Sequence, residues 1–224
     1  MKSERPDETL SYAEIRQSKS LWYRFWKRFF DIVLSVLALI ALSPVFLMTA
    51  IAILVEDGRP VFYAQERAGF HEKPFLCYKF RSMRKDAEKM HEELRKRYGV
   101  TDVSFKLKND PRVTKVGAFI RKYNIDELPQ LWNILRGEMS FVEPRPLPDY
   151  EYREERARYG NAYAVRYSVP QGLTCTWQIS NRSERSFPER MRMDADYAQS
   201  CNFCLDAKLF FLTAIYALTG KAAY

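Results

Sequence analysis

The strongest constraint on this chain is a run of uncharged residues near its start. The 24 residues between Asp31 and Glu56 contain no charged side chain. As an α-helix the run is about 36 Å long, and the hydrocarbon core of a bilayer is about 30 Å thick. A cleaved signal peptide does not fit, because about thirty residues precede the run and no clear cleavage site follows it. We therefore expect a helix that enters a membrane.

A Ser-Pro pair interrupts this run near its middle. Proline lacks a backbone N–H and its ring clashes with the preceding turn, so Pro44 breaks or kinks the helix. The Ser43 hydroxyl can cap the second half or bind a freed carbonyl. Basic residues lie on both sides of the run, whereas the positive-inside rule expects asymmetry across a span. Two interpretations stay open: a re-entrant helix with both ends in the cytoplasm, and a kinked transmembrane helix.

Charge and cysteine usage narrow the class of protein. The 36 Lys and Arg residues outnumber the 28 Asp and Glu residues, and the resulting charge of +8 favours anionic partners. No helix-turn-helix, RNA-recognition or zinc pattern accompanies this charge, so we expect no nucleic-acid binding. The four cysteines form no disulfide framework in 224 residues, which favours a reducing compartment.

The chain after the apolar run predicts a mainly helical α+β domain. Residues 60–83 predict a β-hairpin, because β-prone segments flank a turn at 69–73. The three prolines within 140–149 predict a rigid loop. The C-terminal apolar stretch is too short to span a bilayer and is either core or an interfacial helix. Helices are expected at 84–98, at 114–122, in a segment ending near Gly137, at 150–160 and at 187–200.

An acidic pair opens one of these helical segments. Proline is tolerated only in the first turn of a helix, so Pro129 places Asp126 and Glu127 at the N-terminus, where anions such as phosphate are favoured. Two carboxylates beside a phosphate repel it unless a cation lies between them, and Mg²⁺ suits that role. An Asp held against a phosphoanhydride can act as a covalent nucleophile. The alternative is simple capping of the helix.

Basic side chains in two other segments are candidates for binding phosphate. Lys79 and Arg81 point to the same face of a predicted strand, where two cations suit a phosphate. A solvated face, or attraction to anionic lipid, is the alternative. Arg145 lies between Pro144 and Pro146, which stiffen its backbone and suit bidentate recognition of phosphate by its guanidinium. An exposed arginine in a turn is the alternative.

These segments, in this order, resemble the bacterial sugar transferase family, whose small members are monotopic phosphoglycosyl transferases. The resemblance runs from about residue 20 to the C-terminus, and the series of motifs is highly specific. The matching segments are KRFFDIVLSVLALIALSPVFL, PVFYAQERAG, YKFRSM, IDELPQLWNILRGEMSFVEPRP, GLTCTWQISNRS and MDADY followed by LDAKLF.

The resemblance implies an activity and a site. A sugar-1-phosphate passes from a UDP-sugar to undecaprenyl phosphate, which gives a polyprenyl-diphosphate-sugar and UMP and begins the assembly of a surface glycan. Asp126 is implied to form a covalent phosphosugar intermediate, and Glu127 to bind Mg²⁺ together with Asp126. The residues implied to bind the phosphates are Lys79, Arg81, Arg121 and Arg145.

The resemblance also implies a topology. The membrane helix is re-entrant, broken at Ser43 and Pro44, and contacts lipid from the cytoplasmic face of the bacterial inner membrane. We expect an N-terminal extension (1–20), a re-entrant helix with its flanks (21–58) and a cytosolic catalytic domain (59–224) with amphipathic interfacial helices around its core. A homodimer is compatible with this arrangement.

Four positions depart from the family pattern. Glu143 stands where the family has glycine and adds bulk and negative charge near the expected phosphate site. Gln171 replaces a usual proline, and Cys175 and Asn181 replace common glycines. These changes bear on the choice of nucleotide sugar more than on the reaction. They also motivate an alternative function, a catalytically inactive membrane-anchored scaffold that recruits glycosyltransferases.

Overall fold

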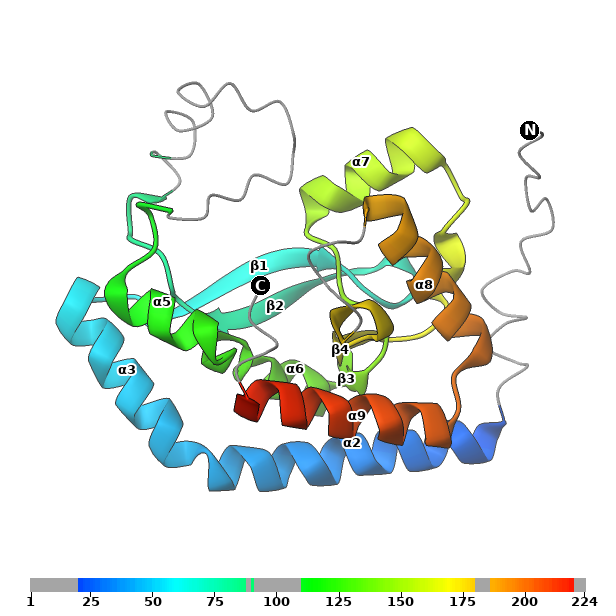
Figure 1. Ribbon diagram of the computed structural model, residues 1–224, viewed down its shortest axis with the longest axis horizontal. Coiled ribbons are helices and arrows are strands. Elements are labelled where there is room, and N and C mark those ends of the chain that lie inside the picture. The colour runs from blue at the N-terminus through cyan, green and yellow to red at the C-terminus, as the bar shows by residue number, and fades with distance from the viewer. Residues whose placement is uncertain (1–19, 88–89, 91–109, 180–185, 220–224) are drawn as a thin grey trace.

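The computed structural model describes residues 20–87, 90, 110–179 and 186–219. Predictions for the N-terminal extension, for most of the helix at 84–98 and for Asn181 lie outside the described residues. The fold is α+β and mainly helical, as predicted (Figure 1). Its elements are α2 (Leu21–Ala41), α3 (Ser43–Asp57), β1 (Phe62–Ala68), η1 (Phe70–Glu72), β2 (Pro74–Phe80), α5 (Lys115–Lys122), η2 (Ile125–Glu127), α6 (Gln130–Arg136), β3 (Met139–Val142), α7 (Asp149–Tyr159), η3 (Ala164–Tyr167), β4 (Gln171–Thr174), η4 (Thr176–Ile179), α8 (Phe187–Ser200) and α9 (Phe203–Thr219).

The uncharged run is divided between α2 and α3, which meet at a bend of 60°. The Ser43 hydroxyl donates a hydrogen bond of 2.8 Å to the Ile40 carbonyl oxygen at this bend. Pro44 lies in the first turn of α3, where its missing N–H leaves no helical bond unmade. In the described part of the chain no single helix is long and apolar enough to cross a bilayer, although the bent pair together has that length and composition.

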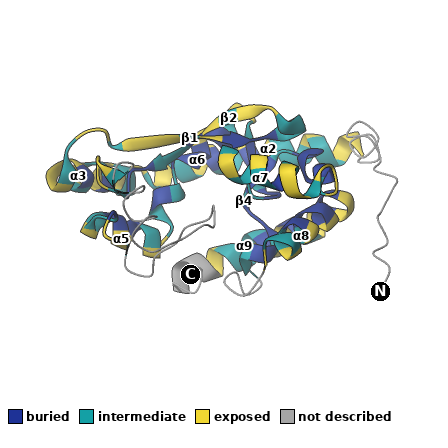
Figure 2. Ribbon diagram, turned by 90° about the horizontal axis from the view of Figure 1, so that it is seen from above, coloured by how far each residue is buried: buried dark blue, intermediate teal, exposed yellow. Residues whose placement is uncertain are grey.

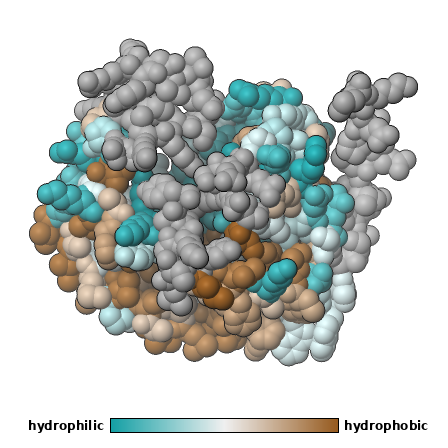
Figure 3. All heavy atoms as spheres, viewed as in Figure 1, coloured by the Kyte–Doolittle hydropathy of each residue, from teal (hydrophilic) through white to brown (hydrophobic). Residues whose placement is uncertain are grey.

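The fully buried side chains of the bent pair are polar except for Ile53, and its outer face exposes apolar side chains. Asp31, Ser35 and Thr49 are buried. A helix packed on a core in water has the opposite distribution. Figure 3 shows the resulting hydrophobic surface along the edge formed by α2, α3 and α9. The exposed apolar side chains of the pair include Leu21, Trp22, Phe25, Phe29, Leu37, Ile40, Leu47, Met48, Ile51 and Val55.

The predicted hairpin is present as β1 and β2, which pair antiparallel. Much of β1 is exposed, and the buried positions gather below the hairpin where α6 and the second sheet lie (Figure 2). At the end of β2, Phe80 is buried in one cluster with Ile53 of α3 and Ile120 of α5. This cluster joins the bent helix pair, the hairpin and α5.

A second, parallel sheet corrects the prediction of a loop over 140–149. β3 pairs with β4, so residues 140–142 are strand rather than loop. The three prolines cannot donate ladder hydrogen bonds, and the strand therefore ends at Val142. Gly172 lets the two strands approach closely, because a Cβ atom there would lie 2.2–2.6 Å from backbone atoms of Glu143. A four-residue strand whose partner lies about thirty residues away has too weak a local signal to predict.

The C-terminal helices close the domain against α2. The predicted helices at 150–160 and 187–200 are present as α7 and α8, and the apolar C-terminal stretch forms α9. The N-terminal ends of α9 and α2 are in contact, with the Tyr23 and Phe203 rings 5.0 Å apart. Val142, Tyr197 and Leu209 join β3, α8 and α9 in one buried cluster. The four cysteines are free thiols, as predicted.

The close approach at Gly172 generates a stability prediction. Gly172→Ala places a methyl group in steric clash with the Glu143 backbone, so the strands must separate. We expect the free energy of unfolding to fall by about 2 kcal/mol. Gly160→Ala is the comparison: a Cβ there meets open space, and the positive φ of 55° alone should cost about 1 kcal/mol of backbone strain. Thermal unfolding of both variants measures the difference, and equal losses would show that the contact is not tight.

Candidate active site

The acidic pair lies in the short turn η2, between α5 and α6. Asn124 adopts a left-handed conformation with φ of 53° and reverses the chain into this turn. Pro129 then precedes α6, as expected for a proline at a helix start. Buried Asn133 of α6 accepts the Tyr78 N–H of β2 at 3.0 Å and donates to the Leu76 carbonyl at 2.7 Å. The strand that carries Lys79 is thereby held beside the turn that carries Asp126.

Glu127 is bound by two cations. Its Oε1 lies 2.7 Å from Lys79 Nζ, and the Arg145 guanidinium binds both carboxylate oxygens, with Nη1 3.2 Å from Oε2. Burial opposes ionisation of Glu127, but the charges of Arg145 and Lys79 outweigh it and hold the pKa of this carboxyl well below its usual range. Glu127 is therefore ionised and fixes both cations in the site.

Asp126 has a different environment. It is 8% exposed, and within the described part of the chain its carboxylate accepts no hydrogen bond. Burial and the neighbouring Glu127 charge raise the pKa of Asp126, while Lys79, Arg121 and Arg145 act against the shift. Two adjacent carboxyls thus have pKa values displaced in opposite directions, a pattern found where two acids have different roles.

The structure brings three of the four predicted phosphate ligands to the acidic pair. Lys79 and Arg145 bind Glu127, and Arg121 acts electrostatically on Asp126 while donating from Nε to the Ser82 hydroxyl at 2.8 Å. Arg81 lies elsewhere. Its guanidinium binds the Asp57 carboxylate at 3.0 Å and the Gly58 carbonyl at 2.7 Å, at the end of α3.

Lys79 and Arg81 therefore bind different acids, Glu127 and Asp57, although they are two residues apart. β2 ends at Phe80, so the strand alternation that predicts a common face does not continue to Arg81. In this structure Arg81 connects the hairpin to α3, and its assignment to substrate stays a prediction.

Arg166 is a residue of the site's surroundings that the sequence did not reveal. It is fully buried, and its Nη2 donates to the Arg145 carbonyl at 2.6 Å and to Asp194 at 2.7 Å. Its segment, Ala164-Val165-Arg166-Tyr167, is otherwise apolar or aromatic. A single charged residue in an otherwise apolar segment could have marked Arg166 as buried and paired. The sequence does not indicate which distant carbonyl its side chain binds.

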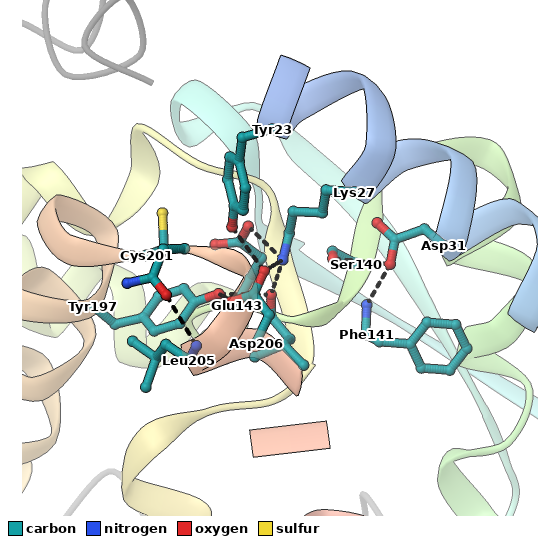
Figure 4. A network of polar contacts seen from close by, with 12 residues as sticks. Tyr23, Lys27, Asp31, Ser140, Phe141, Glu143, Tyr197, Cys201, Leu205 and Asp206 are labelled. Carbon is teal, nitrogen blue, oxygen red and sulfur yellow. Dashed lines mark hydrogen bonds and ion pairs between the residues drawn. The ribbon is translucent and has the colours of Figure 1, made fainter. Parts of the chain in front are cut away.

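Residues that depart from the family pattern surround the Arg145 segment. Gln171 is buried and donates from Nε2 to the Arg166 and Val169 carbonyls at 3.3 and 3.2 Å. Cys175 is also buried, and its thiol contacts Gln178. Glu143 lies 3.3 Å from Lys27 of α2 in a buried polar cluster (Figure 4). All three side chains are buried, so these differences from the family pattern lie inside the domain.

The acidic pair fits a Mg²⁺ site only if the protein supplies few of the metal's ligands. Among the described residues no group of three or more His, Cys, Asp or Glu side chains could hold a metal ion. Mg²⁺ commonly binds through one or two carboxylates and completes its coordination with water and substrate phosphates. The Asp126 carboxylate, which accepts no hydrogen bond from the described residues, meets that requirement, whereas both oxygens of Glu127 already bind Lys79 or Arg145. Asp126 is therefore the available ligand, and binding of Mg²⁺ by Glu127, which would have to exchange one of these contacts, stays a prediction.

A family model described as bacterial sugar transferase matches residues 22–220. This chain belongs to the bacterial sugar transferase family. The predicted resemblance is confirmed, and with it the prediction that the protein is an enzyme of this class.

Three curated relatives show how far the similarity extends. Undecaprenyl-phosphate galactose phosphotransferase of Salmonella typhimurium is 39% identical over 205 residues, which are 90% of this chain and 42% of that protein. Exopolysaccharide production protein ExoY of Sinorhizobium fredii is 38% identical over 202 residues, 88% of each protein. Undecaprenyl-phosphate glucose phosphotransferase of Komagataeibacter xylinus is 37% identical over 223 residues, 93% of this chain and 39% of that one. The chain thus spans less than half of two relatives and most of the third.

The ion pairs of Glu127 generate a prediction about stability and pH. Glu127→Gln leaves Lys79 and Arg145 buried without a counter-charge, and we expect a loss of about 3 kcal/mol at pH 7. A depressed carboxyl pKa stabilises the fold above the unfolded value, about 4.5, and this contribution is lost as pH falls through the folded value. The difference between the two proteins should therefore shrink between pH 5 and pH 3.

Thermal unfolding across this pH range measures the effect. Glu66→Gln, at an exposed position of β1, is the matched control and should follow the wild type at every pH. A constant difference between wild type and Glu127→Gln down to pH 3 would contradict the assigned ionisation of Glu127.

Proposed function

We propose that this protein transfers a sugar-1-phosphate from a UDP-sugar to undecaprenyl phosphate. The observation that carries the proposal is the acidic pair with Lys79, Arg121 and Arg145 around it, in a chain of the sugar transferase family. The relatives named as undecaprenyl-phosphate galactose and glucose phosphotransferases support the lipid acceptor. The relative named as an exopolysaccharide production protein supports a role in surface glycan assembly.

The residues divide the chemistry into two displacements. An oxygen of the Asp126 carboxylate attacks the phosphorus that carries the sugar, the anhydride bond to the second phosphorus breaks, and UMP leaves. A phosphate oxygen of undecaprenyl phosphate then attacks the same phosphorus, the acyl phosphate bond breaks, and the Asp126 carboxylate is regenerated. Nucleophilic catalysis of this kind replaces one difficult step with two easier ones.

The surrounding cations stabilise the negative charge that develops on the phosphate oxygens. Arg145 and Lys79 are held in place by Glu127 before substrate arrives, so little reorganisation is needed. Asp126 and Glu127 would hold Mg²⁺, which would supply positive charge beside the diphosphate. Burial raises the pKa of Asp126. Positive charge from a bound Mg²⁺ would act against this shift and favour the ionised, nucleophilic form of Asp126.

We also propose that α2 and α3 form a re-entrant segment inserted from the cytoplasmic side. Three features support this: the bend of 60°, the exposed apolar outer face and the burial of the polar side chains Asp31, Ser35 and Thr49. In this proposal the bent pair returns to the leaflet it entered, and α9 continues the same hydrophobic surface (Figure 3). A water-soluble donor and a lipid acceptor can then meet at the site, at the membrane surface.

Release of UMP tests the proposed function. The purified protein is incubated with a panel of UDP-sugars, with and without undecaprenyl phosphate. Without the acceptor, a covalent intermediate predicts at most one UMP per enzyme and a mass increase of one phosphosugar. Asp126→Asn should abolish UMP release and lipid product together, because the nucleophile is lost.

Asp196→Asn, at an exposed position of α8, is the matched control and should retain wild-type turnover. UMP release by Asp126→Asn at near the wild-type rate would contradict the covalent mechanism. Absence of turnover with every UDP-sugar would contradict the function itself and favour the scaffold.

Cysteine labelling tests the topology. Ser20→Cys and Arg59→Cys lie at the two ends of the bent pair, and both are made in a background in which exposed Cys204 is serine. An impermeant thiol reagent should label both positions in inside-out vesicles and neither in intact spheroplasts. Labelling of the two positions from opposite sides would show a membrane span instead.

A further inference from the structure

Glu143 lies where the bent helix pair, α9 and the Arg145 segment meet. Its side chain is buried, with 1% of the residue exposed. One carboxylate oxygen is 3.3 Å from Lys27 Nζ, and the other is buried and has no hydrogen-bond partner among the described residues. A buried carboxylate with one oxygen unbonded is poorly compensated, so Glu143 requires an explanation that Lys27 alone does not supply.

The cluster around Glu143 contains more acid than base. Lys27 is the cation of the cluster, and it also lies 2.6 Å from Asp206 and 2.9 Å from the Val142 carbonyl (Figure 4). Asp31 accepts from the Ser140 hydroxyl and the Phe141 N–H, each at 3.1 Å. The titratable groups that face Glu143 are Tyr23, Lys27 and Asp31 of α2, Tyr197 of α8 and Asp206 of α9.

Asp206 is the best-compensated acid of this cluster. Besides Lys27, it accepts hydrogen bonds from the hydroxyl groups of Tyr23 and Tyr197. Among the described residues, the Glu143 carboxylate has the longer contact with Lys27 and no other polar partner. With one cation and three carboxyls in a buried volume, the charge is balanced most readily when Glu143 is neutral.

Glu143 is two residues from Arg145, and the chain between them is tightly held. The Glu143 N–H donates to the Thr174 carbonyl at 3.0 Å, and the Pro144 carbonyl accepts from Gly172 at 2.7 Å. Lys27 and Tyr197 both donate to the Val142 carbonyl. Residues 143–145 form a short segment that Pro144 stiffens, and the side chain of Arg145 binds Glu127. A change of charge at Glu143 therefore acts on the backbone that holds Arg145.

We propose that Glu143 is a positioning residue for Arg145. In its neutral form it closes the contact between α2, α9 and residues 142–146. In its ionised form it repels Asp206, loosens that contact and displaces the guanidinium from its productive position. The test of this role by UMP release rests on the proposed function, whereas the test by thermal unfolding does not.

The ionisation falls in an accessible range. Burial raises the pKa of the Glu143 carboxyl to about 8, with Lys27 acting against the shift and Asp206 adding to it. The folded chain thus retains a proton that the unfolded chain releases above about pH 4.5. Stability associated with Glu143 is therefore lost as pH rises from about 4.5 to about 8.

The test compares wild type with Glu143→Gln, which mimics the neutral acid, and with Glu66→Gln as the exposed control. Full-length proteins in detergent are assayed for kcat/KM of UMP release and for thermal unfolding between pH 6.5 and pH 9. Wild type and control should lose activity about tenfold between pH 7 and pH 9 through this group. Glu143→Gln should lose much less, and its unfolding midpoint should fall less over the same range.

Two results would overturn the proposal: an alkaline loss of activity equal in Glu143→Gln and wild type, or a folded Glu143→Gln that is inactive at every pH. Glu143→Met, an uncharged side chain of similar length, replaces the Gln variant if that variant does not fold. If wild type releases UMP from no UDP-sugar, the proposed function fails. The unfolding series then decides alone, and equal pH dependence in wild type and the neutral variant rejects the role of Glu143.

Discussion

The rest of the structure depends on the polar face of α2. Lys27 binds the β3 backbone and Asp206, Arg28 binds the last carbonyls of α6, with its Nη2 2.6 Å from the Leu135 oxygen, and Asp31 binds the Phe141 N–H. Asp31 is buried and Lys27 and Arg28 are half-buried, so the loss of a partner in the domain would cost free energy. The same arrangement turns the apolar side chains of α2 outward. One face thus docks the domain, and the opposite face supplies the hydrophobic surface.

Two contacts of α2 connect it to the segments that carry the candidate active site. Arg28 satisfies carbonyls at the C-terminal end of α6, the helix that follows Asp126 and Glu127. Lys27 holds the carbonyl of Val142, three residues before Arg145. The acidic pair and its principal arginine are therefore both positioned from the helix that forms the hydrophobic surface. For the proposed transfer from a soluble donor to a lipid acceptor, such a rigid attachment of the site to its surface helix is an advantage.

Much of the fold follows from local pattern, and the errors have local causes too. The hairpin, the break at Ser43 and Pro44 and the helix at Lys115–Lys122 are each predicted by β-propensity, proline chemistry or helical periodicity. The strand β3 is hidden by the prolines that follow it, and its partner β4 is distant in sequence. Arg166 is invisible as a contributor because its partners, the Arg145 carbonyl and Asp194, lie 21 and 28 residues away.

The sequence by itself determined where the apolar run breaks, which carboxylates form a pair and which arginine has a stiff backbone, because these depend on residues within a few positions of each other. Only the tertiary structure decided the partners. Lys79 binds Glu127 whereas Arg81 binds Asp57, although both belong to one basic stretch. Glu143, which in the sequence appears as a charge near the site, is buried against Lys27. The physical reason is that a side chain's charge state and role follow from the groups that exclude water around it, and these come from distant segments.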